Sequence, residues 1–384
     1  MRRRYLDHAS TSPLRPEARD AIAAVFDGGF GDPSRIHEEG MAARQIVEVA
    51  REQVAGLVGA RSRSVVFTSG ATEAIAAAVW GASRRGRHQV VTAVEHSAVR
   101  DQAERAGEVT VVGVDRLGRV DPDEVAAAVR PGETAAVHVQ WGNHEVATVQ
   151  PVAEVVERCR GLDVLVHVDA AQAVGHVPFA FDELGADLVS VSAHKFGGPA
   201  GVGALLVRRG LRIDPLLLGG DQERARRAGH ENTPGIVGFG AACAALSTDD
   251  LLSAESMSNR RRRRRIVEAM AHVEGVEVLG DPGAAEPDGP GRPGGALPHL
   301  VCLGLAGVEP QPVLIGLDRA GIAVHSGSSC SSEAFEPSPV LAAMGVDAER
   351  SLRVSIGWTT TDDDVDAFLA ELPRILAELR ALSR

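Results

Sequence analysis

Short runs of β-branched and other apolar residues alternate with helix-like stretches from about residue 16 to residue 250. The strand candidates are 65–70, 89–94, 109–114, 135–140, 163–170, 187–194 and 203–209. Between most of them lie helix-like stretches such as 72–85 and 121–130. This alternation predicts a large α/β domain with a mostly parallel, seven-stranded sheet that helices cover on both faces.

The connection between the last two strand candidates is too short for a crossover helix. Only the eight residues 195–202 separate 187–194 from 203–209. A parallel pair needs a crossover of about a dozen residues or more, whereas a hairpin can join antiparallel strands. We therefore expect 203–209 to be an antiparallel strand at an edge of the sheet.

The pattern changes after about residue 250. It predicts a helix over 259–275, a Gly/Pro-rich loop over 280–298, and a C-terminal amphipathic helix, acidic at its start, over 361–382. Three further strand candidates lie at 299–305, 322–328 and 351–357. We expect two domains, a large α/β domain over 15–250 and a smaller α+β domain formed by 1–14 and 251–384.

Charge and hydropathy argue against nucleic-acid and membrane partners. The formal net charge is −12, which disfavours binding to nucleic acids or anionic membranes. The six arginines 260–265 point all round a helix, so we interpret them as its solvated start rather than a basic docking face. No apolar run approaches the length of a bilayer span, and no apolar signal-peptide core follows the N-terminus. We expect a cytoplasmic protein.

Four cysteines in 384 residues are too few for a disulfide framework, which also favours a reducing cytoplasm. Cys159 and Cys243 fall in helical patterns and Cys302 in an apolar strand, so we expect all three in the core. Cys330 lies instead in a Ser/Gly-rich loop after a strand candidate. Such a loop does not suit a cysteine of the core.

Lys195 is the one lysine in the chain, set against 39 arginines among the 40 basic residues. A bias toward arginine on the surface would make its survival accidental. A guanidinium, however, stays protonated at any working pH, whereas an amine can lose its proton and act as a nucleophile. We interpret Lys195 as a position whose chemistry requires an amine.

Polar side chains follow four of the predicted strands, where open parallel sheets bind their ligands. Residues 69–72 lead into a helix whose N-terminal N–H groups favour a phosphate. The other three ends carry His96, then Asp169 and Gln172, then Ser192, His194 and Lys195. Taken singly, Asp169 could be a helix N-cap and His96 a hydrogen-bonded loop histidine. Together, a phosphate cradle, an acid, a histidine and an amine indicate pyridoxal 5′-phosphate (PLP).

These segments resemble the cysteine desulfurases, the class V aminotransferase branch of the fold-type I PLP-dependent enzymes. The similar segments run nearly end to end: YLDHAST (5–11), GDPSRIHEEG (31–40), VVFTSGATEA (65–74), VEHSAV (94–99), HVDAAQAVG (167–175), SAHKFGGPAGVGALLVRRG (192–210), HSGSSCSSEAFEPS (325–338) and LRVSIG (352–357). The resemblance implies a large PLP-binding domain, a small domain with a catalytic cysteine loop, and a homodimer whose active sites borrow residues across the interface.

The resemblance also implies a role for each site residue. Lys195 would form the Schiff base and shuttle protons at the substrate α-carbon, and Asp169 would contact the pyridine nitrogen. His96 would stack on the ring, with Gln172 near the ring hydroxyl. Around the phosphate would lie Ala71, Thr72, Ser192 and His194, and Arg353 would bind the substrate carboxylate. No metal is expected.

The same resemblance gives Cys330 a role. Its thiolate would take sulfur from L-cysteine, leaving L-alanine and a persulfide that passes to an acceptor or scaffold protein. A surface cysteine without a function is the alternative.

Three positions depart from the family pattern. Asp32 stands where an asparagine helps to hold the substrate carboxylate. His144 stands at an asparagine that faces cofactor and substrate, and His230 replaces a threonine that reaches the partner subunit's PLP phosphate. Asn143, beside His144, is expected to bind the substrate. We hypothesise that Asp32 and His144 pair, and that His230 supplies an imidazole. These departures leave open a pathway-dedicated desulfurase, a PLP-dependent C–S lyase or selenocysteine lyase, and a degenerate paralogue that binds a sulfur carrier.

Overall fold

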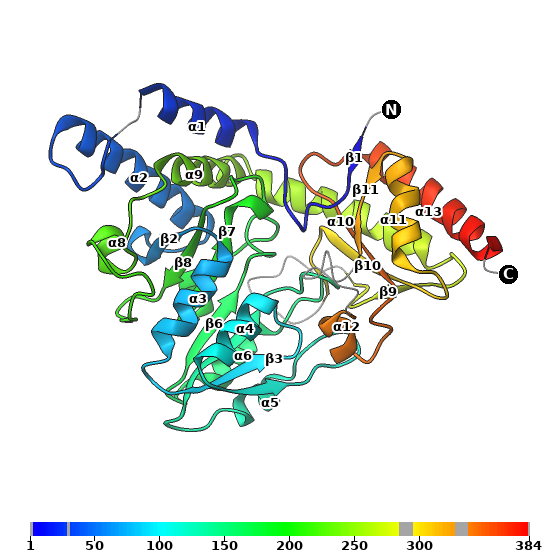
Figure 1. Ribbon diagram of the computed structural model, residues 1–384, viewed down its shortest axis with the longest axis horizontal. Coiled ribbons are helices and arrows are strands. Elements are labelled where there is room, and N and C mark those ends of the chain that lie inside the picture. The colour runs from blue at the N-terminus through cyan, green and yellow to red at the C-terminus, as the bar shows by residue number, and fades with distance from the viewer. Residues whose placement is uncertain (1–2, 29–30, 284–294, 327–336, 383–384) are drawn as a thin grey trace.

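A seven-stranded sheet with the order β2-β8-β7-β6-β5-β3-β4 lies within the larger lobe of the molecule (Figure 1). The computed structural model describes residues 3–28, 31–283, 295–326 and 337–382. The strands of this sheet are β2 (Val65–Thr68), β3 (His88–Thr92), β4 (Glu108–Val112), β5 (Thr134–Gln140), β6 (Leu165–Asp169), β7 (Leu188–Ser192) and β8 (Gly203–Val207). Neighbours from β4 to β7 are parallel, and β8 runs antiparallel to both β7 and β2. The predicted mostly parallel sheet is confirmed.

Strand β8 has the predicted direction but not the predicted place. It lies between β7 and β2, so β2 and β4 are the edge strands, and the expectation of an edge position was wrong. Every residue of β8 is buried. Its unbroken apolar sequence, Gly-Ala-Leu-Leu-Val, suits a strand that is covered on both faces and paired on both sides.

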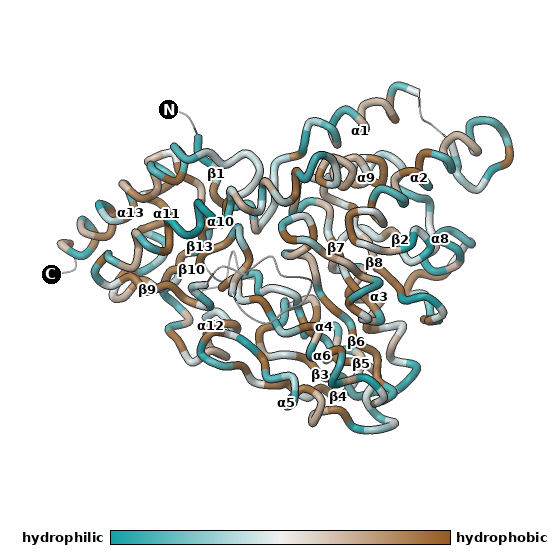
Figure 2. The backbone as a smooth tube through the Cα atoms, turned by 180° about the vertical axis from the view of Figure 1, so that it is seen from behind, coloured by the Kyte–Doolittle hydropathy of each residue, from teal (hydrophilic) through white to brown (hydrophobic). Residues whose placement is uncertain are grey.

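Helices cover both faces of this sheet, as expected. On one face the strands pack with residues of α2, α6 and α9, such as Val54, Val155 and Phe239; on the other they pack with α3 and α4, through residues such as Ala78 and Val99. The sheet strands are mostly hydrophobic along their length (Figure 2). The helices of this part are α1 (Pro16–Gly28), α2 (Glu38–Leu57), α3 (Ala71–Ala82), α4 (Ser97–Ala106), α5 (Pro122–Ala127), α6 (Val152–Cys159), α7 (Phe181–Leu184), α8 (Gln222–Ala225) and α9 (Thr233–Ser247), with 3₁₀ turns at Ser62–Ser64 and Ala193–Lys195.

A second apolar core gathers around a smaller sheet with the order β12-β13-β10-β9, together with the two-stranded pair β1-β11. Its strands are β1 (Arg4–Tyr5), β9 (Val276–Leu279), β10 (Leu300–Leu305), β11 (Ile322–Ala323), β12 (His325–Ser326) and β13 (Ser351–Ser355), and its helices are α10 (Leu251–Met270), α11 (Pro310–Arg319), α12 (Pro339–Ala343) and α13 (Asp362–Leu382). Strand β1 brings the start of the chain into this region (Figure 1). The short strand β9 was not predicted, and the division at 14/15 and 250/251 stays a prediction.

The arginine run 260–265 lies in the second half of α10 and not at its start, so that interpretation was wrong. Arg263 is 2% exposed and donates hydrogen bonds to the carbonyls of Leu300 and Asp281. Arg262 forms an ion pair of 2.9 Å with Asp362 of α13. The run therefore joins α10 to its neighbours. Among the described residues no single helix could span a membrane, and only the pair α9 and α10, bent by 77°, has the length and composition.

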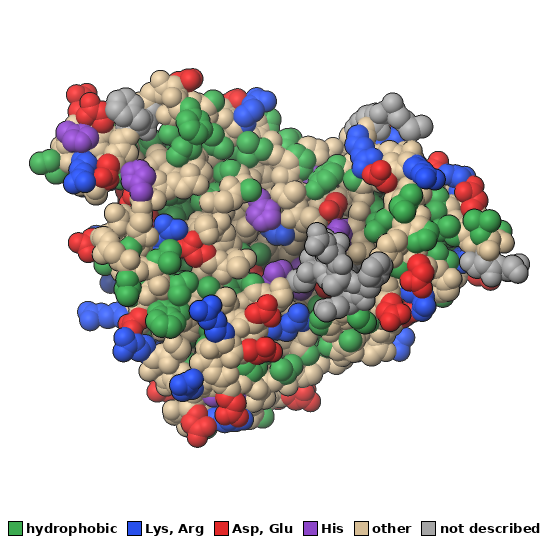
Figure 3. Space-filling view, viewed as in Figure 1, with side chains coloured by type: hydrophobic (Ala, Val, Ile, Leu, Met, Phe, Trp, Pro, Cys, Tyr) green, Lys and Arg blue, Asp and Glu red, His purple; other side chains and the backbone are tan. Residues whose placement is uncertain are grey.

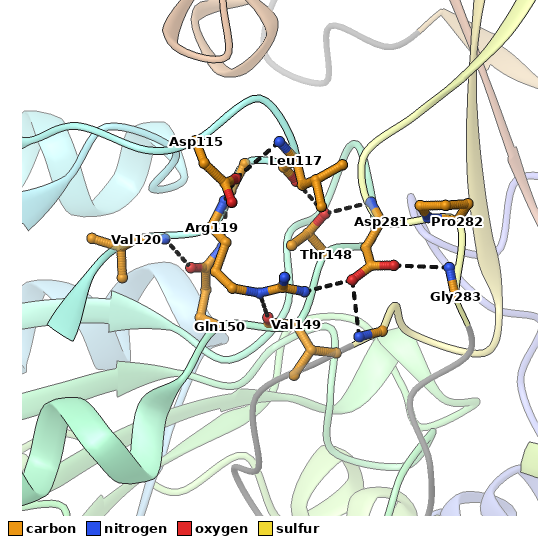
Figure 4. Close-up of polar contacts among 12 residues, drawn as sticks. Asp115, Leu117, Arg119, Val120, Thr148, Val149, Gln150, Asp281, Pro282 and Gly283 are labelled. Atoms are coloured by element: carbon orange, nitrogen blue, oxygen red, sulfur yellow. Dashed lines mark hydrogen bonds and ion pairs between the residues drawn. The ribbon is translucent and has the colours of Figure 1, made fainter.

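A group of polar contacts joins the segment after β9 to the loops that follow β4 and β5 (Figure 4). The Asp281 carboxylate forms an ion pair of 2.6 Å with Arg119 and accepts hydrogen bonds from the N–H groups of Gly283 and Gly295. Its own N–H donates to the Thr148 hydroxyl over 3.0 Å. Arg119, Gly283 and Gly295 therefore meet at one carboxylate, and Thr148 contacts the backbone of the same residue. Burial alone would raise the pKa of Asp281, but Arg119 and the two N–H groups outweigh it and lower this pKa. The carboxylate therefore stays charged.

Candidate cofactor site

A cavity of about 430 Å³ opens beyond the carboxyl ends of β3, β5, β6 and β7, next to the first turn of α3. The space-filling view shows a hollow near the middle of this face, with histidine side chains close by (Figure 3). The predicted site residues that line the cavity are Ala71, Thr72, His96, His144, Asp169, Gln172, Ser192, His194, Lys195 and Arg353. These residues come from at least five separate segments, and the fold brings them together.

Two backbone carbonyls hold the Lys195 amine just after the carboxyl end of β7. Its Nζ atom donates to the carbonyl of Ala9 over 2.8 Å and to that of Ser10 over 3.1 Å. Burial, assisted by the positive charge of Arg353, lowers the pKa of Lys195 to about 8, against the opposing effect of Asp169. A larger fraction of this amine is therefore neutral near physiological pH than of an ordinary lysine.

The first turn of α3 offers backbone N–H groups to the cavity. The turn begins at Ala71 after Gly70, and a Cβ atom added to Gly70 would meet nothing within 4 Å, so the approach to the helix end is open. Ser192 and His194 also line the cavity. Burial lowers the pKa of His194 to about 4, so its ring is neutral and can donate only one hydrogen bond.

Asp169 and His96 each make a local capping hydrogen bond and also line the cavity. The Asp169 carboxylate accepts a hydrogen bond of 3.0 Å from the N–H of Ala171, as a capping residue would, and it also lines the cavity. His96 is the N-cap of α4, where its Nδ1 atom accepts from Ala98 over 3.1 Å. Because Nδ1 accepts, the proton of the neutral ring is on Nε2. Local capping thus fixes the orientation of both side chains.

Arg353 and His144 form the wall that faces the smaller sheet. Arg353 of β13 is 2% exposed and donates to the His144 carbonyl over 3.0 Å and to the Ser10 hydroxyl over 2.8 Å; it also forms an ion pair of 3.2 Å with Asp7. The His144 ring lies edge-on to that of His96, with centroids 5.0 Å apart. Burial lowers the pKa of His144, although Glu145 at 3.5 Å opposes this effect.

Three of the described residues that were predicted for the site do not line this cavity. The Asn143 amide donates to the Val94 carbonyl after β3 and accepts from the N–H groups of residues 145 and 146 in its own loop. Asp32 pairs with Arg35 at 3.1 Å, so the hypothesised pair with His144 is not formed within the chain. His230 is exposed, and its charge acts on Asp32. Cys330 lies outside the described residues.

Sequence reasoning missed Glu95 and the two carbonyls that hold the lysine. The Glu95 side chain is fully buried behind His96, and Oε1 accepts from the Thr92 hydroxyl and from the N–H of Gln140. Burial, with a further contribution from Asp169, raises the pKa of Glu95 to about 7. The sequence could have indicated Glu95, because it directly precedes the predicted site residue His96. Nothing in the sequence indicates that the carbonyls of Ala9 and Ser10 hold the lysine.

The lining residues fit PLP. They offer a partly neutral amine, a carboxylate, and N–H groups at the start of a helix, which are the groups that this cofactor requires. Two buried atoms of lining residues, Nδ1 of His144 and Nε of Arg353, have no hydrogen-bond partner among the described residues. The part of the chain that the structure describes holds no cluster of side chains suited to a metal ion. The buried state of Cys159, Cys243 and Cys302 is as predicted.

The chain is similar to known proteins over nearly its whole length. The family model of aminotransferase class-V matches residues 4–368. The chain is 39% identical to the cysteine desulfurase IscS of Dictyoglomus turgidum, over 99% of this chain and 96% of that protein. It is 38% identical to the cysteine desulfurase IscS of Methanosarcina thermophila, over 99% and 93%.

Solved structures agree with these relatives. A NifS-like protein superimposes with a TM-score of 0.88 at 30% identity, covering 98% of this chain and 100% of that chain. The NifS-like protein from Rickettsia africae gives a TM-score of 0.86 at 27% identity, over 98% and 100%. The fold-type I prediction and the resemblance are confirmed. The chain belongs to the aminotransferase class-V family and, within it, to the PLP-dependent cysteine desulfurases.

Proposed function

We propose that this protein converts L-cysteine to L-alanine and carries the released sulfur as a persulfide on Cys330, for transfer to an acceptor protein. The observation that supports this most directly is the Lys195 amine, lowered in pKa to about 8 and held in a cavity that also contains Asp169, His96 and Arg353. The departures at Asp32, His144 and His230 leave this set intact.

The cavity residues would hold PLP between the two sheets. Lys195 would form the covalent bond to the cofactor, and the Asp169 carboxylate would face its pyridine nitrogen. The N–H groups of Ala71 and Thr72, with Ser192 and His194, would surround the phosphate. When bound, PLP supplies an electron sink that stabilises negative charge at the α-carbon of the substrate.

Two residues would then act on the substrate. The Arg353 guanidinium, fixed by Asp7 and Ser10, is rigid enough to orient the cysteine carboxylate. The Lys195 amine, with its lowered pKa, would take the proton from the α-carbon and return a proton when the product forms. The ring of His96, held by its bond to Ala98, would cover the face of the cofactor.

The Cys330 thiolate would attack the sulfur atom of the bound cysteine. The carbon–sulfur bond of the substrate breaks, a sulfur–sulfur bond forms on Cys330, and the carbon skeleton leaves as alanine after protonation. This assignment comes from the sequence alone.

One incubation tests the proposal. The protein is mixed with L-cysteine, and alanine and the mass of the Cys330 peptide are measured together. We expect alanine and a persulfide adduct in the native chain, and neither in Cys330→Ala. Sulfide release that survives in Cys330→Ala would favour a C–S lyase. A colourless protein that takes up no PLP, or a borohydride adduct absent from Lys195, would favour a sulfur-carrier-binding paralogue.

We further propose a cytoplasmic homodimer in which His230 serves the partner subunit's site, without membrane or nucleic-acid partners. Exposed apolar side chains on α1, on α2 and the segment before it, and on the loop before α8 support a protein interface, among them Phe26, Ile36, Met41 and Leu218. Mixing Lys195→Ala with His230→Ala subunits tests this arrangement. If His230 acts across the interface, the mixed dimer contains one complete site and regains activity. No recovery would mean that His230 acts in its own chain or not at all.

A further inference from the structure

Two buried histidines are stacked behind Lys195, outside the wall of the cavity. The rings of His176 and His299 lie nearly parallel, with centroids 3.6 Å apart and an interplanar angle of 13°. His176 is 6% exposed and His299 is not exposed at all. His176 follows β6 in the chain and His299 immediately precedes β10, so each sheet contributes one ring.

The hydrogen bonds of the pair determine the position of each ring proton. Nε2 of His176 lies 3.1 Å from the carbonyl oxygen of Lys195, which can only accept, so this nitrogen carries a proton. The Gln172 amide donates from Nε2 to the carbonyl of Ala9 over 2.9 Å, which leaves its Oε1 atom to face Nε2 of His299 at 3.2 Å. That nitrogen must also carry a proton. Both rings therefore donate through Nε2.

Both rings are neutral. Burial lowers the pKa of His176 to about 3 and the pKa of His299 well below its usual value, and Lys195 opposes a positive charge on either ring. Nδ1 of His299 has no hydrogen-bond partner among the described residues, so no contact there opposes placing the proton on Nε2. Two neutral imidazoles can stack face to face, whereas two imidazolium ions would repel each other.

The two donated bonds lead to Lys195 by two different routes. His176 binds the backbone carbonyl of Lys195 itself. His299 binds Gln172, whose amide reaches the same Ala9 carbonyl that accepts from the Lys195 amine at 2.8 Å. The pair thus fixes the lysine backbone and, through Gln172, the acceptor of its amine.

We propose that His176 and His299 are positioning residues of the cofactor site. His299 sets the Gln172 amide so that its NH₂ group, and not its oxygen, faces Lys195 and the cofactor, while His176 holds the Lys195 backbone. The inference rests on the proposed assignment of Lys195 and Gln172 to PLP. Without the donor at position 299 only the Ala9 carbonyl orients the amide, so the amide turns over more readily and then presents an acceptor to the site.

The test compares His299→Leu, which removes the donor, with His299→Gln, which keeps an N–H at a similar reach. PLP affinity and the pH titration of the visible absorption of the bound cofactor are measured for each. We expect His299→Leu to weaken PLP binding about tenfold, as the loss of one buried hydrogen bond would, and to shift the titration midpoint. His299→Gln should restore both to within about threefold of the native protein.

His138→Leu is the matched control, because His138 is equally buried but lies within β5 and bonds to Gln89 and His167. It should destabilise the fold and leave the titration unchanged. If His299→Leu and His138→Leu lose PLP affinity equally, with the titration unmoved in both, the proposal is wrong. The effect of His299→Leu should also vanish in a Gln172→Leu background, because the imidazole acts through the amide; an undiminished effect would contradict the proposal.

Two further measurements keep the inference testable if His299→Leu does not fold. Nitrogen-15 NMR of the histidine-labelled native protein at pH 7 should show neutral rings protonated at Nε2 for both residues, with His299→Gln used to assign one signal. A ring protonated at Nδ1, or a charged ring, would overturn the inference. Borohydride trapping in the native protein tests Lys195 separately, so failure of the proposed function is distinguished from failure of this inference.

Discussion

Among the residues that the structure describes, two pairs of adjoining buried histidines differ in where their remaining hydrogen bonds lead. In the large sheet, Nδ1 of His138 lies 3.0 Å from Nδ1 of His167. Their outer nitrogens bond to Gln89 at 3.0 Å and to Ser190 at 2.8 Å, so the row crosses β3, β5, β6 and β7 and ends within the sheet. The pair of His176 and His299 leads instead to Lys195 and Gln172.

The comparison shows that burial and pKa do not separate a structural histidine from a functional one. Burial lowers the pKa of His138 to about 4 and that of His176 to about 3, so all four rings are neutral near pH 7. What differs is the group at the end of each hydrogen-bonded chain. Substitutions that remove the hydrogen bonds of one pair and leave those of the other should therefore have different effects on stability and on the cofactor site.

The largest effect is expected from Lys195→Ala. This change removes the amine but keeps the backbone carbonyl that His176 binds, so the stacked pair and the fold should remain. Alanine formation from L-cysteine should fall by about 10³-fold or more, because the covalent bond to the cofactor and the proton transfer are both lost. Circular dichroism should be unchanged. Lys195→Arg should be equally inactive, since a guanidinium does not lose its proton; activity within tenfold of native in either variant would contradict the assignment.

His138→Leu should have the next largest effect, and on stability alone. It leaves Gln89 Oε1 and His167 Nδ1 buried without partners, each at a cost of about 1–3 kcal/mol, so the free energy of unfolding should drop by about 2–5 kcal/mol. Urea unfolding measures this drop. Activity per folded molecule and the cofactor spectrum should stay within about twofold of native. A spectral change as large as that in His299→Leu would remove the distinction between the pairs.

Much of the fold and site could be predicted because neighbouring residues carry the signal. Each of the seven strands of the large sheet is a local apolar run, and Lys195 stands out by composition alone. The direction of β8 could be predicted because it follows from the short loop between β7 and β8. Its place in the sheet was missed because it depends on pairing with β2, which lies 135 or more residues earlier in the chain. The contact between His299 and Gln172 spans 127 positions, and nothing near either residue indicates it. Long-range contacts between polar side chains are the part that local patterns do not contain.

The free energy of unfolding should depend more steeply on pH in the native protein than in His138→Gln. The pKa of His138 is about 4 in the folded protein, whereas an ordinary histidine, as in the unfolded chain, has a pKa of 6.5. Between these values the unfolded chain binds more protons, so stability is present above pH 6.5 and is lost as the pH falls toward 4. His138→Gln should show a shallower decline, by about 1.4 kcal/mol per pH unit, in urea unfolding from pH 7 to pH 4.5. Parallel curves would show that His138 is not neutral in the folded protein.

The smallest expected effect concerns the lysine rather than the histidines that position it. Because the neutral amine reacts, PLP uptake by the apo protein should rise with pH and level off above the Lys195 pKa of about 8. Burial is the main cause of the lowered pKa and Arg353 the second, so Arg353→Gln should raise the pKa and move the uptake curve to higher pH. Burial remains, so the shift should be only part of the total displacement, about one pH unit or less. Arg374→Gln, on the exposed face of α13, is the control and should leave the curve in place. A curve that does not move in Arg353→Gln would mean that the guanidinium does not act on the amine, and that burial, with the carbonyls of Ala9 and Ser10, sets its proton affinity alone.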